Sequence, residues 1–182
     1  NILDFSNDTY SSLISIVNQK PFIFNMSIRK NLDFVDKNIE NQIEACKKAG
    51  IHDFIETLPD GYNTILRENG SNISGGQKQM ISIARTILSK SEVILLDDIT
   101  TSLDPDTAKL VPRLINELKK DHTIIMVTKK PDLMRKADRI VVLNNGTITT
   151  VGTHKQLIEK SEIYRMLQSR KSPSRIGVFD ND

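Results

Sequence analysis

Ile73-Ser-Gly-Gly-Gln-Lys-Gln-Met80 begins a stretch that continues through Val93-Ile-Leu-Leu-Asp-Asp98 and ends at Thr101-Ser-Leu-Asp104. In order, these residues predict a glycine-containing turn, a helix, a buried strand that ends in two acidic residues, and a tight acidic loop. That order suits the binding of a phosphate chain together with its metal ion. The stretch therefore predicts a site as well as a scaffold.

The turn has the sequence of a helix start. Ser74 and Gln77 fit a capping box, in which each side chain bonds the backbone amide of the other residue. Gly75 and Gly76 leave bare N–H groups at the positive end of the helix dipole, which favours phosphate oxygens. A capped helix without a ligand is the alternative that this motif leaves open. Apolar residues at helical spacing then predict one buried face: Met80, Ile81, Ala84, Ile87 and Leu88.

The apolar run 93–96 is short and continuous, which is typical of a strand buried on both faces of a parallel sheet. Asp97 and Asp98 follow at its carboxyl end, the edge where open α/β sheets bind ligands. A carboxylate there suits Mg²⁺ bridged to phosphates, and the adjacent second carboxylate can act as a base or orient water. The alternative is that both acids only cap the next loop.

These residues resemble the ATP-binding cassette (ABC) ATPases, and specifically the nucleotide-binding domains of exporter-type transporters. Residues 73–77 are similar to the signature motif of that family, residues 93–97 to its Walker B strand and residues 101–104 to its D-loop. The resemblance covers about 14–167, because further segments also match: the Q-loop at 17–20, the segment 58–64 that leads to the signature, and the domain end at 137–146 and 151–154.

The resemblance implies an α/β fold, namely a P-loop NTPase (RecA-like) core with a parallel sheet and an inserted α-helical subdomain. Residues 1–170 are expected to form a partial nucleotide-binding domain. Within it, about 27–90 is the helical subdomain and 91–170 the C-terminal part of the core. Residues 171–182, with their Ser-Pro and charged residues, are expected to be a flexible tail.

The resemblance also implies the roles of individual residues toward ATP and Mg²⁺. Gln19 and Asp97 are expected at the metal, and Asp98, Gln19 and Lys129 take the catalytic positions. The expected nucleotide-binding residues are Ser74, Gly75, Gly76, Gln77 and Asp104.

Two positions depart from the family pattern in the same expected active site. Lys129 stands where the family has its switch histidine, and Lys can only donate hydrogen bonds, whereas neutral imidazole can also accept. Asp98 replaces the usual glutamate, and one methylene less draws the carboxylate back from the attacking water. Some exporters of this family are heterodimers with one hydrolytic and one degenerate site. We therefore expect this chain to contribute to a degenerate site in a heterodimer; a slow homodimer is the alternative.

A phosphate loop of the form Gly-x-x-x-x-Gly-Lys-Ser/Thr is absent from the 182 residues, and the family places it before the point where this sequence starts. The chain is therefore expected to be the C-terminal part of a longer domain, inactive by itself and weak in ATP binding. The expected partners are a second nucleotide-binding domain and a transmembrane domain at the cytoplasmic face of a membrane, which residues 21–24 would contact. No nucleic acid is expected.

Composition agrees with a soluble globular domain, at 38% hydrophobic residues and a net charge of +2. No apolar run approaches the roughly 18 residues of a membrane span. The single cysteine, Cys46, predicts a reducing compartment and core packing. Two other classes stay open at this point: a soluble ABC-type ATPase without a transport role, and a non-catalytic interaction module that lacks the phosphate loop.

Several local expectations can be checked against the structure. Gly50 should end a helix, Asn145-Gly146 should turn a hairpin, and Pro112 should kink a helix that begins at Pro105. Residues 123–128 should form another buried strand. Thr153 should cap one last helix that contains Leu157, Ile163, Met166 and Leu167, and both His52 and His154 should have structural roles.

Overall fold

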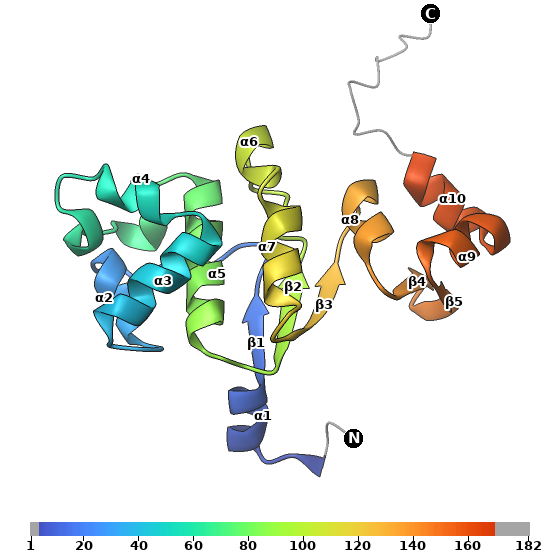
Figure 1. Ribbon diagram of the computed structural model, residues 1–182, viewed down its shortest axis with the longest axis horizontal. Helices are drawn as coiled ribbons and strands as arrows, with labels where there is room; N and C mark the ends of the chain where they lie inside the picture. The colour runs from blue at the N-terminus through green and yellow to red at the C-terminus, as the bar shows by residue number, and fades with distance from the viewer. Residues whose placement is uncertain (1–3, 170–182) are drawn as a thin grey trace, which may run out of the picture. The chain divides into compact units, whose positions relative to one another are not determined.

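The computed structural model describes residues 4–169 (Figure 1). The chain divides between Val127 and Thr128 into two compact units, each described by itself below. The expected flexible tail, 171–182, lies outside the described residues.

The first unit combines a small sheet with a group of helices. Its elements in chain order are α1 (Asn7–Leu13), β1 (Ile14–Val17), α2 (Ile28–Asp33), α3 (Ile39–Ala49), α4 (His52–Glu56), η2 (Gly61–Asn63), η3 (Glu68–Gly70), α5 (Gly75–Leu88), β2 (Val93–Asp97), α6 (Pro105–Ala108), α7 (Val111–Leu118) and β3 (Thr123–Val127). Helix α5 packs against α3 on one side and against β1 on another, so it connects the helices to the sheet.

The three strands form a parallel sheet in the order β1-β2-β3, as the sequence predicts. The central strand β2 buries Ile94 and Leu96. Strand β3 departs from the prediction of a buried strand, because Ile125 and Val127 are 57% and 63% exposed. The reason is its position: within residues 4–169, β3 is hydrogen-bonded to β2 alone, at the edge of the sheet.

The helices of the first unit begin and end largely where short-range sequence signals place them. Gly50 terminates α3 in the left-handed conformation, with φ of +76°. Asp104 caps α6, and Pro105 takes its first position. His52 has the expected structural role, since its Nδ1 lies 3.0 Å from the Tyr62 hydroxyl.

The prediction of one helix kinked at Pro112 is wrong. The helix that begins at Pro105 ends at Ala108, and a second helix, α7, begins at Val111. Pro112 therefore lies in the first turn of α7, where a backbone N–H has no intrahelical partner to lose. Proline at this position costs little stability, and the helical conformation is interrupted before it, between Ala108 and Val111.

The second unit consists of α8 (Pro131–Lys136), the antiparallel hairpin β4 (Ile140–Asn144) and β5 (Thr147–Gly152), α9 (His154–Lys160) and α10 (Glu162–Ser169). Asn145 and Gly146 turn the hairpin with positive φ at both positions, as predicted. Four buried side chains form its core: Met134, Val142, Leu157 and Tyr164.

Thr153 caps α9 with a capping box, which confirms that prediction. The prediction of one single last helix is wrong, because the structure has two helices, α9 and α10. The chain leaves the helical conformation at Ser161, and the Ser161 hydroxyl accepts a hydrogen bond from the Tyr164 amide at 3.2 Å. This serine supplies a new start for α10, and Tyr164 then reaches His154, whose Nδ1 lies 2.8 Å from the tyrosine hydroxyl.

Candidate functional site

The N-terminus of α5 has the geometry of a capped, glycine-lined anion site. The Ser74 amide donates to Gln77 Oε1 at 2.8 Å, and the Gln77 amide donates to Ser74 Oγ at 3.1 Å. The capping box is therefore formed as predicted. The amides of Gly75 and Gly76 belong to the first turn, where a helix offers no carbonyl partner. These two N–H groups are the ones that an anion can use.

The loop 101–104 lies directly against this first turn of α5. A Cβ atom on Gly75 would lie 3.4 Å from both Cβ and the carbonyl oxygen of Ser102. A Cβ atom on Gly76 would lie 3.6 Å from a carboxylate oxygen of Asp104. The structure thus brings all five expected nucleotide-binding residues into one group: Ser74, Gly75, Gly76, Gln77 and Asp104.

The Asp104 carboxylate is held in place by the start of α6. Its Oδ1 accepts from the amides of Asp106 and Thr107, both at 3.0 Å, and its Oδ2 accepts from the Thr107 hydroxyl at 2.6 Å. The hydrogen bonds from Thr107 and Asp106 lower the pKa of Asp104 below its usual range. The side chain is therefore an ionised cap that fixes the loop beside the glycines.

Asp97 and Asp98 occupy the carboxyl end of the central strand. Asp97 is the last residue of β2 and is exposed, whereas Asp98 is partly buried. Asp98 turns the chain with a φ of +39°, its amide donates to the Val127 carbonyl at 3.0 Å, and its Oδ1 accepts from the Thr100 hydroxyl at 3.4 Å. Asp tolerates this left-handed conformation better than most residues. The two acids thus follow one strand but have different surroundings.

Gln19 reaches the same edge of the sheet from the neighbouring strand. Val17 pairs with Leu96, so the residues after β1 lie beside Asp97 and Asp98. Gln19 is exposed there. The structure brings Gln19 and the two acids to one edge, and no hydrogen bond among the described residues joins this group to the glycine turn of α5. Lys129, exposed and two residues after β3, belongs to the second unit, so its place beside Asp98 stays a prediction.

The acidic edge offers a small set of oxygen ligands. No cluster of three or more His, Cys, Asp or Glu side chains is present within residues 4–169. Two carboxylates and one amide oxygen are nevertheless the kind of set that Mg²⁺ uses when phosphates and water complete its coordination. The residues present therefore fit Mg²⁺ bound together with a phosphate chain, and they do not form a metal cage by themselves.

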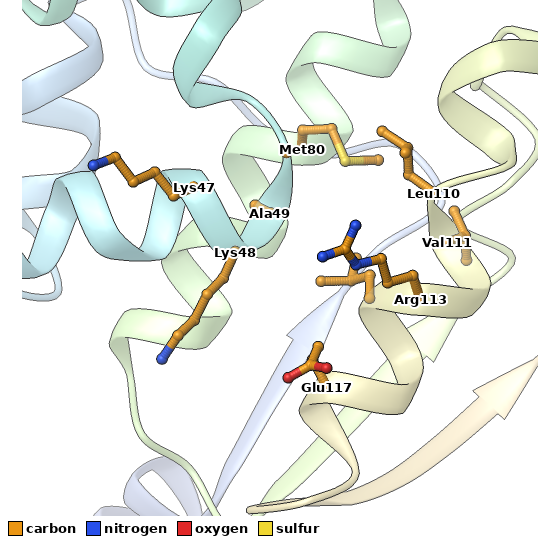
Figure 2. A pocket seen from close by; sticks show the side chains of 10 residues that line it. Lys47, Lys48, Ala49, Met80, Leu110, Val111, Arg113 and Glu117 are labelled. Carbon is orange, nitrogen blue, oxygen red and sulfur yellow. The ribbon is translucent and has the colours of Figure 1, made fainter.

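A separate pocket of about 420 Å³ lies between α3, α5 and α7 (Figure 2). Met80 and Leu110 form part of its apolar wall, and Lys47, Lys48 and Arg113 supply basic groups. None of the expected site residues lines it. The glycine turn of α5 and the acidic edge of the sheet therefore both lie outside this pocket.

Sequence reasoning missed two polar side chains of α5 that contact the segment around Gln19. Gln79 is fully buried and donates to the Asn18 carbonyl at 3.1 Å. Arg85 is half-buried and donates to the Phe22 carbonyl at 2.7 Å. The available signal was that Gln79 and Arg85 are the only long polar side chains between Gln79 and Leu88, a stretch of α5 that is otherwise apolar or small.

In the described part of the chain, no helix has both the length and the apolar character required to cross a membrane.

Residues 3–101, more than half of the chain, match the protein family described as ABC transporter. The chain is 40% identical over 168 residues to the uncharacterized ABC transporter ATP-binding protein YknU of Bacillus subtilis (strain 168), covering 91% of this chain and 29% of that protein. It is 36% identical to the ATP-dependent lipid A-core flippase of Haemophilus influenzae (strain 86-028NP), covering 93% of this chain and 29% of the flippase.

A solved structure agrees with these sequence matches. The chain superposes on a bacterial Atm1-family ABC exporter with ATP bound, with a TM-score of 0.83 and 29% sequence identity, over 88% of this chain and 29% of the exporter chain. The chain thus spans less than a third of the length of each of these three proteins.

Proposed function

Because the chain belongs to the ABC transporter family, we propose that it forms part of the nucleotide-binding domain of an exporter, which couples ATP binding and hydrolysis to transport across a membrane. The observation that carries this proposal is the contact between the glycine turn of α5 and the loop 101–104. An exporter and a flippase among the matched proteins favour transport over a soluble ATPase or a non-catalytic module.

The two groups of residues described above would serve two different nucleotides, each bound between this chain and a second nucleotide-binding domain. In this proposal Asp97 and Gln19 hold Mg²⁺, and the amides of Gly75 and Gly76 hold phosphate oxygens at the end of the α5 dipole. Bound Mg²⁺ would neutralise charge that develops on the phosphates. Ser74 and Gln77 keep the turn in shape, and Asp104 fixes the adjoining loop. No phosphate loop is present in the 182 residues, so the chain supplies only part of a complete site.

A second nucleotide-binding domain is the first proposed partner. Ser74 and Gly75 at the start of α5 are exposed, Gly76 is buried, and the 182 residues hold no phosphate loop, which suits a site completed across an interface. We place this chain in a heterodimer, in which Asp98 and Lys129 contribute to a degenerate site and residues 74–77 complete the partner's hydrolytic site. Lys129 cannot accept a hydrogen bond, and Asp98 is a methylene shorter than glutamate, so both changes weaken water activation.

A transmembrane domain is the second proposed partner, and an aromatic patch is the proposed contact. The aromatic patch consists of Phe22, Phe24, Phe34 and Val35, which are between 38% and 62% exposed. Its rings contact one another, with centroids 4.9 Å apart for Phe22 and Phe24 and 4.7 Å for Phe24 and Phe34. Contiguous exposed apolar side chains of this kind mark interaction sites. The patch would place the domain at the cytoplasmic face of the membrane.

The degenerate site can be tested in the complete natural protein by combining Asp98→Glu with Lys129→His. The longer carboxylate and the imidazole should improve activation of the attacking water, and we expect ATP turnover to rise by at least about tenfold, which is a fraction of the roughly 10²–10⁴-fold that a well-placed general base contributes. The measurement is the steady-state release of phosphate from MgATP.

The matched control combines Asp53→Glu with Lys136→His, which makes the same chemical changes at two exposed residues that are not among the predicted site residues. It should leave turnover unchanged. If the site variant gains nothing over this control, Asp98 and Lys129 do not limit hydrolysis, and the degenerate-site assignment is wrong.

A further inference from the structure

The pocket between α3, α5 and α7 has an aliphatic floor. Val111 and Leu114 of α7 are 1% and 6% exposed, and Met80 of α5 is 2% exposed. Leu110 closes one end of the pocket, since a Cβ atom on Gly50 would lie 3.5 Å from Leu110 Cδ1. None of the described residues that line it is aromatic. These walls suit an aliphatic group, and the flexible thioether of Met80 can adapt to its shape.

Two of the charged side chains that line the pocket are already paired within their own helices. Lys48 Nζ lies 2.8 Å from a carboxylate oxygen of Glu44, and Lys120 Nζ lies 2.8 Å from one of Glu117. The hydrogen bond from Lys120 is the main reason that the pKa of Glu117 lies below its usual range, and the charges of Arg113 and Lys48 contribute. The carboxylate of Glu117 is therefore ionised and engaged by cations.

Arg113 and Lys47 supply positive charge that no acidic group neutralises directly. Their side chains have no hydrogen-bond or ion-pair partner among residues 4–169. Figure 2 shows the guanidinium of Arg113 in the space between α7 and the helices α3 and α5, whereas the ammonium group of Lys47 points away from it. Arg113 is thus the cation that a ligand in this pocket would meet.

The chemistry of Arg113 favours a carboxylate over other anions. A guanidinium is a planar fork that binds the two oxygens of one carboxylate in parallel. A phosphate group with two negative charges would be repelled more strongly by Glu117, which lines the same pocket. A singly charged, planar anion therefore matches the available donors best.

We propose that this pocket binds an aliphatic monocarboxylate, with its carboxylate on Arg113 and its chain over Met80 and Val111. The volume of about 420 Å³ lies within the range of roughly 300–1,000 Å³ that small-molecule sites occupy. The inference goes beyond the proposed function and does not depend on it, because none of the expected nucleotide-binding residues lines the pocket.

The test uses the complete natural protein and a ten-carbon carboxylate that carries a photoreactive diazirine at its apolar end. After irradiation, mass spectrometry maps the labelled peptides, and the concentration dependence of labelling gives the affinity. Within residues 4–169 we expect the label at 79–81 and 110–114, beside the aliphatic floor. Unlabelled decanoate should protect these residues, whereas decanol, which has the same chain without the charge, should not do so at the same concentration.

Arg113→Gln removes the cation and keeps a polar side chain at an exposed position. We expect the affinity for the probe to fall about tenfold or more, which is the scale of a hydrogen bond to a charged group. Arg29→Gln makes the same exchange at an exposed arginine of α2 that does not line the pocket, and it should label as wild type does. Melting temperatures of both variants identify any loss through unfolding.

Leu110→Ala tests the apolar part of the site independently of the charge. Leu110 is 47% exposed, so its truncation should leave the fold intact. The affinity should fall about threefold or more, because the chain of the probe buries less apolar surface.

Four results would overturn the inference. Within residues 4–169, the label could lie mainly outside the two expected ranges, or Arg113→Gln could keep the wild-type affinity. Protection by decanol as strong as that by decanoate would mean that the pocket accepts a chain without a charge. Stronger protection by decyl phosphate than by decanoate would show that the choice of a carboxylate is wrong.

Discussion

At the scale of single residues, Cys46 shows how burial alone determines chemistry. The thiol is fully buried in α3 and faces the Tyr62 hydroxyl, which in turn contacts His52. Burial raises the pKa of Cys46 to about 11, and the neighbouring Tyr62 opposes this effect only in part. The thiol is thus a packing group rather than a nucleophile, as the sequence predicts for a lone cysteine in a helix.

This shift predicts a loss of stability at alkaline pH. The folded state keeps the proton that the unfolded state releases, so the unfolded state binds fewer protons between about pH 9 and pH 11, and the free energy of unfolding falls across that interval. At pH 10.5 the thiol should account for a loss of about 2 kcal/mol relative to pH 8. Urea unfolding at the two pH values measures this difference, with Cys46→Ala as the comparison.

In Cys46→Ala the absolute stability falls because a cavity forms, but the additional pH dependence should disappear. Equal pH dependence in both proteins would mean that Cys46 keeps an ordinary pKa in the folded state. Burial is the largest cause of the raised pKa of Tyr62, and Cys46 adds to it, so the comparison reports the coupled pair of Cys46 and Tyr62.

At the scale of elements, Pro112 tests where helices tolerate proline. Because Pro112 is the second residue of α7, Pro112→Ala restores an amide that has no intrahelical partner. We expect the free energy of unfolding to change by less than about 1 kcal/mol. Leu114→Pro, two residues further along, removes an intrahelical hydrogen bond and a buried side chain and should cost about 3 kcal/mol or more. Denaturant midpoints give both values.

A cost of that larger size for Pro112→Ala would show that the proline itself sets the break between α6 and α7. A small effect would assign the break to the residues before it, Lys109 and Leu110.

Elements that depend on local signals could be predicted from the sequence, and elements that depend on distant contacts could not. Ser74, Asp104 and Thr153 start helices through bonds to residues two or three positions away, and Asn145-Gly146 turns a hairpin by its own conformation. The exposure of β3 depends on which strands flank it, and no local pattern reveals that. The break at Ser161 was also missed, because Tyr164 continues the apolar spacing across it.

The candidate site divides in the same way. The residue types of the site could be predicted from motifs. The residues of the glycine turn are consecutive in the sequence, and so are the buried strand and the two acids that follow it. The contact of Gly75 with Ser102 and the positive φ of Asp98 arise from tertiary packing. The hydrogen bonds from Gln79 and Arg85 join residues that lie more than 50 positions apart in the sequence. Hydrophobic periodicity therefore cannot predict them.

At the scale of the whole molecule, the two units bury separate sets of side chains. The first unit buries Leu32, Ile81 and Leu96 among others, and the second has its own core of Met134, Val142, Leu157 and Tyr164. Because each core is contained within its unit, damage to one core should weaken that unit first. Local opening of this kind is seen when cooperative units differ in stability.

Leu157→Ala and Leu32→Ala form a matched pair for this prediction, since both leucines are at most 1% exposed. Each truncation should cost about 2–5 kcal/mol, because it removes buried methyl groups and leaves a cavity. Amide hydrogen exchange in the complete natural protein should then become faster mainly in 131–169 for Leu157→Ala and mainly in 14–127 for Leu32→Ala. If either variant accelerates exchange equally in both ranges, the two cores unfold as one cooperative unit. In that case the boundary after Val127 would separate two compactly packed units that do not unfold independently of each other.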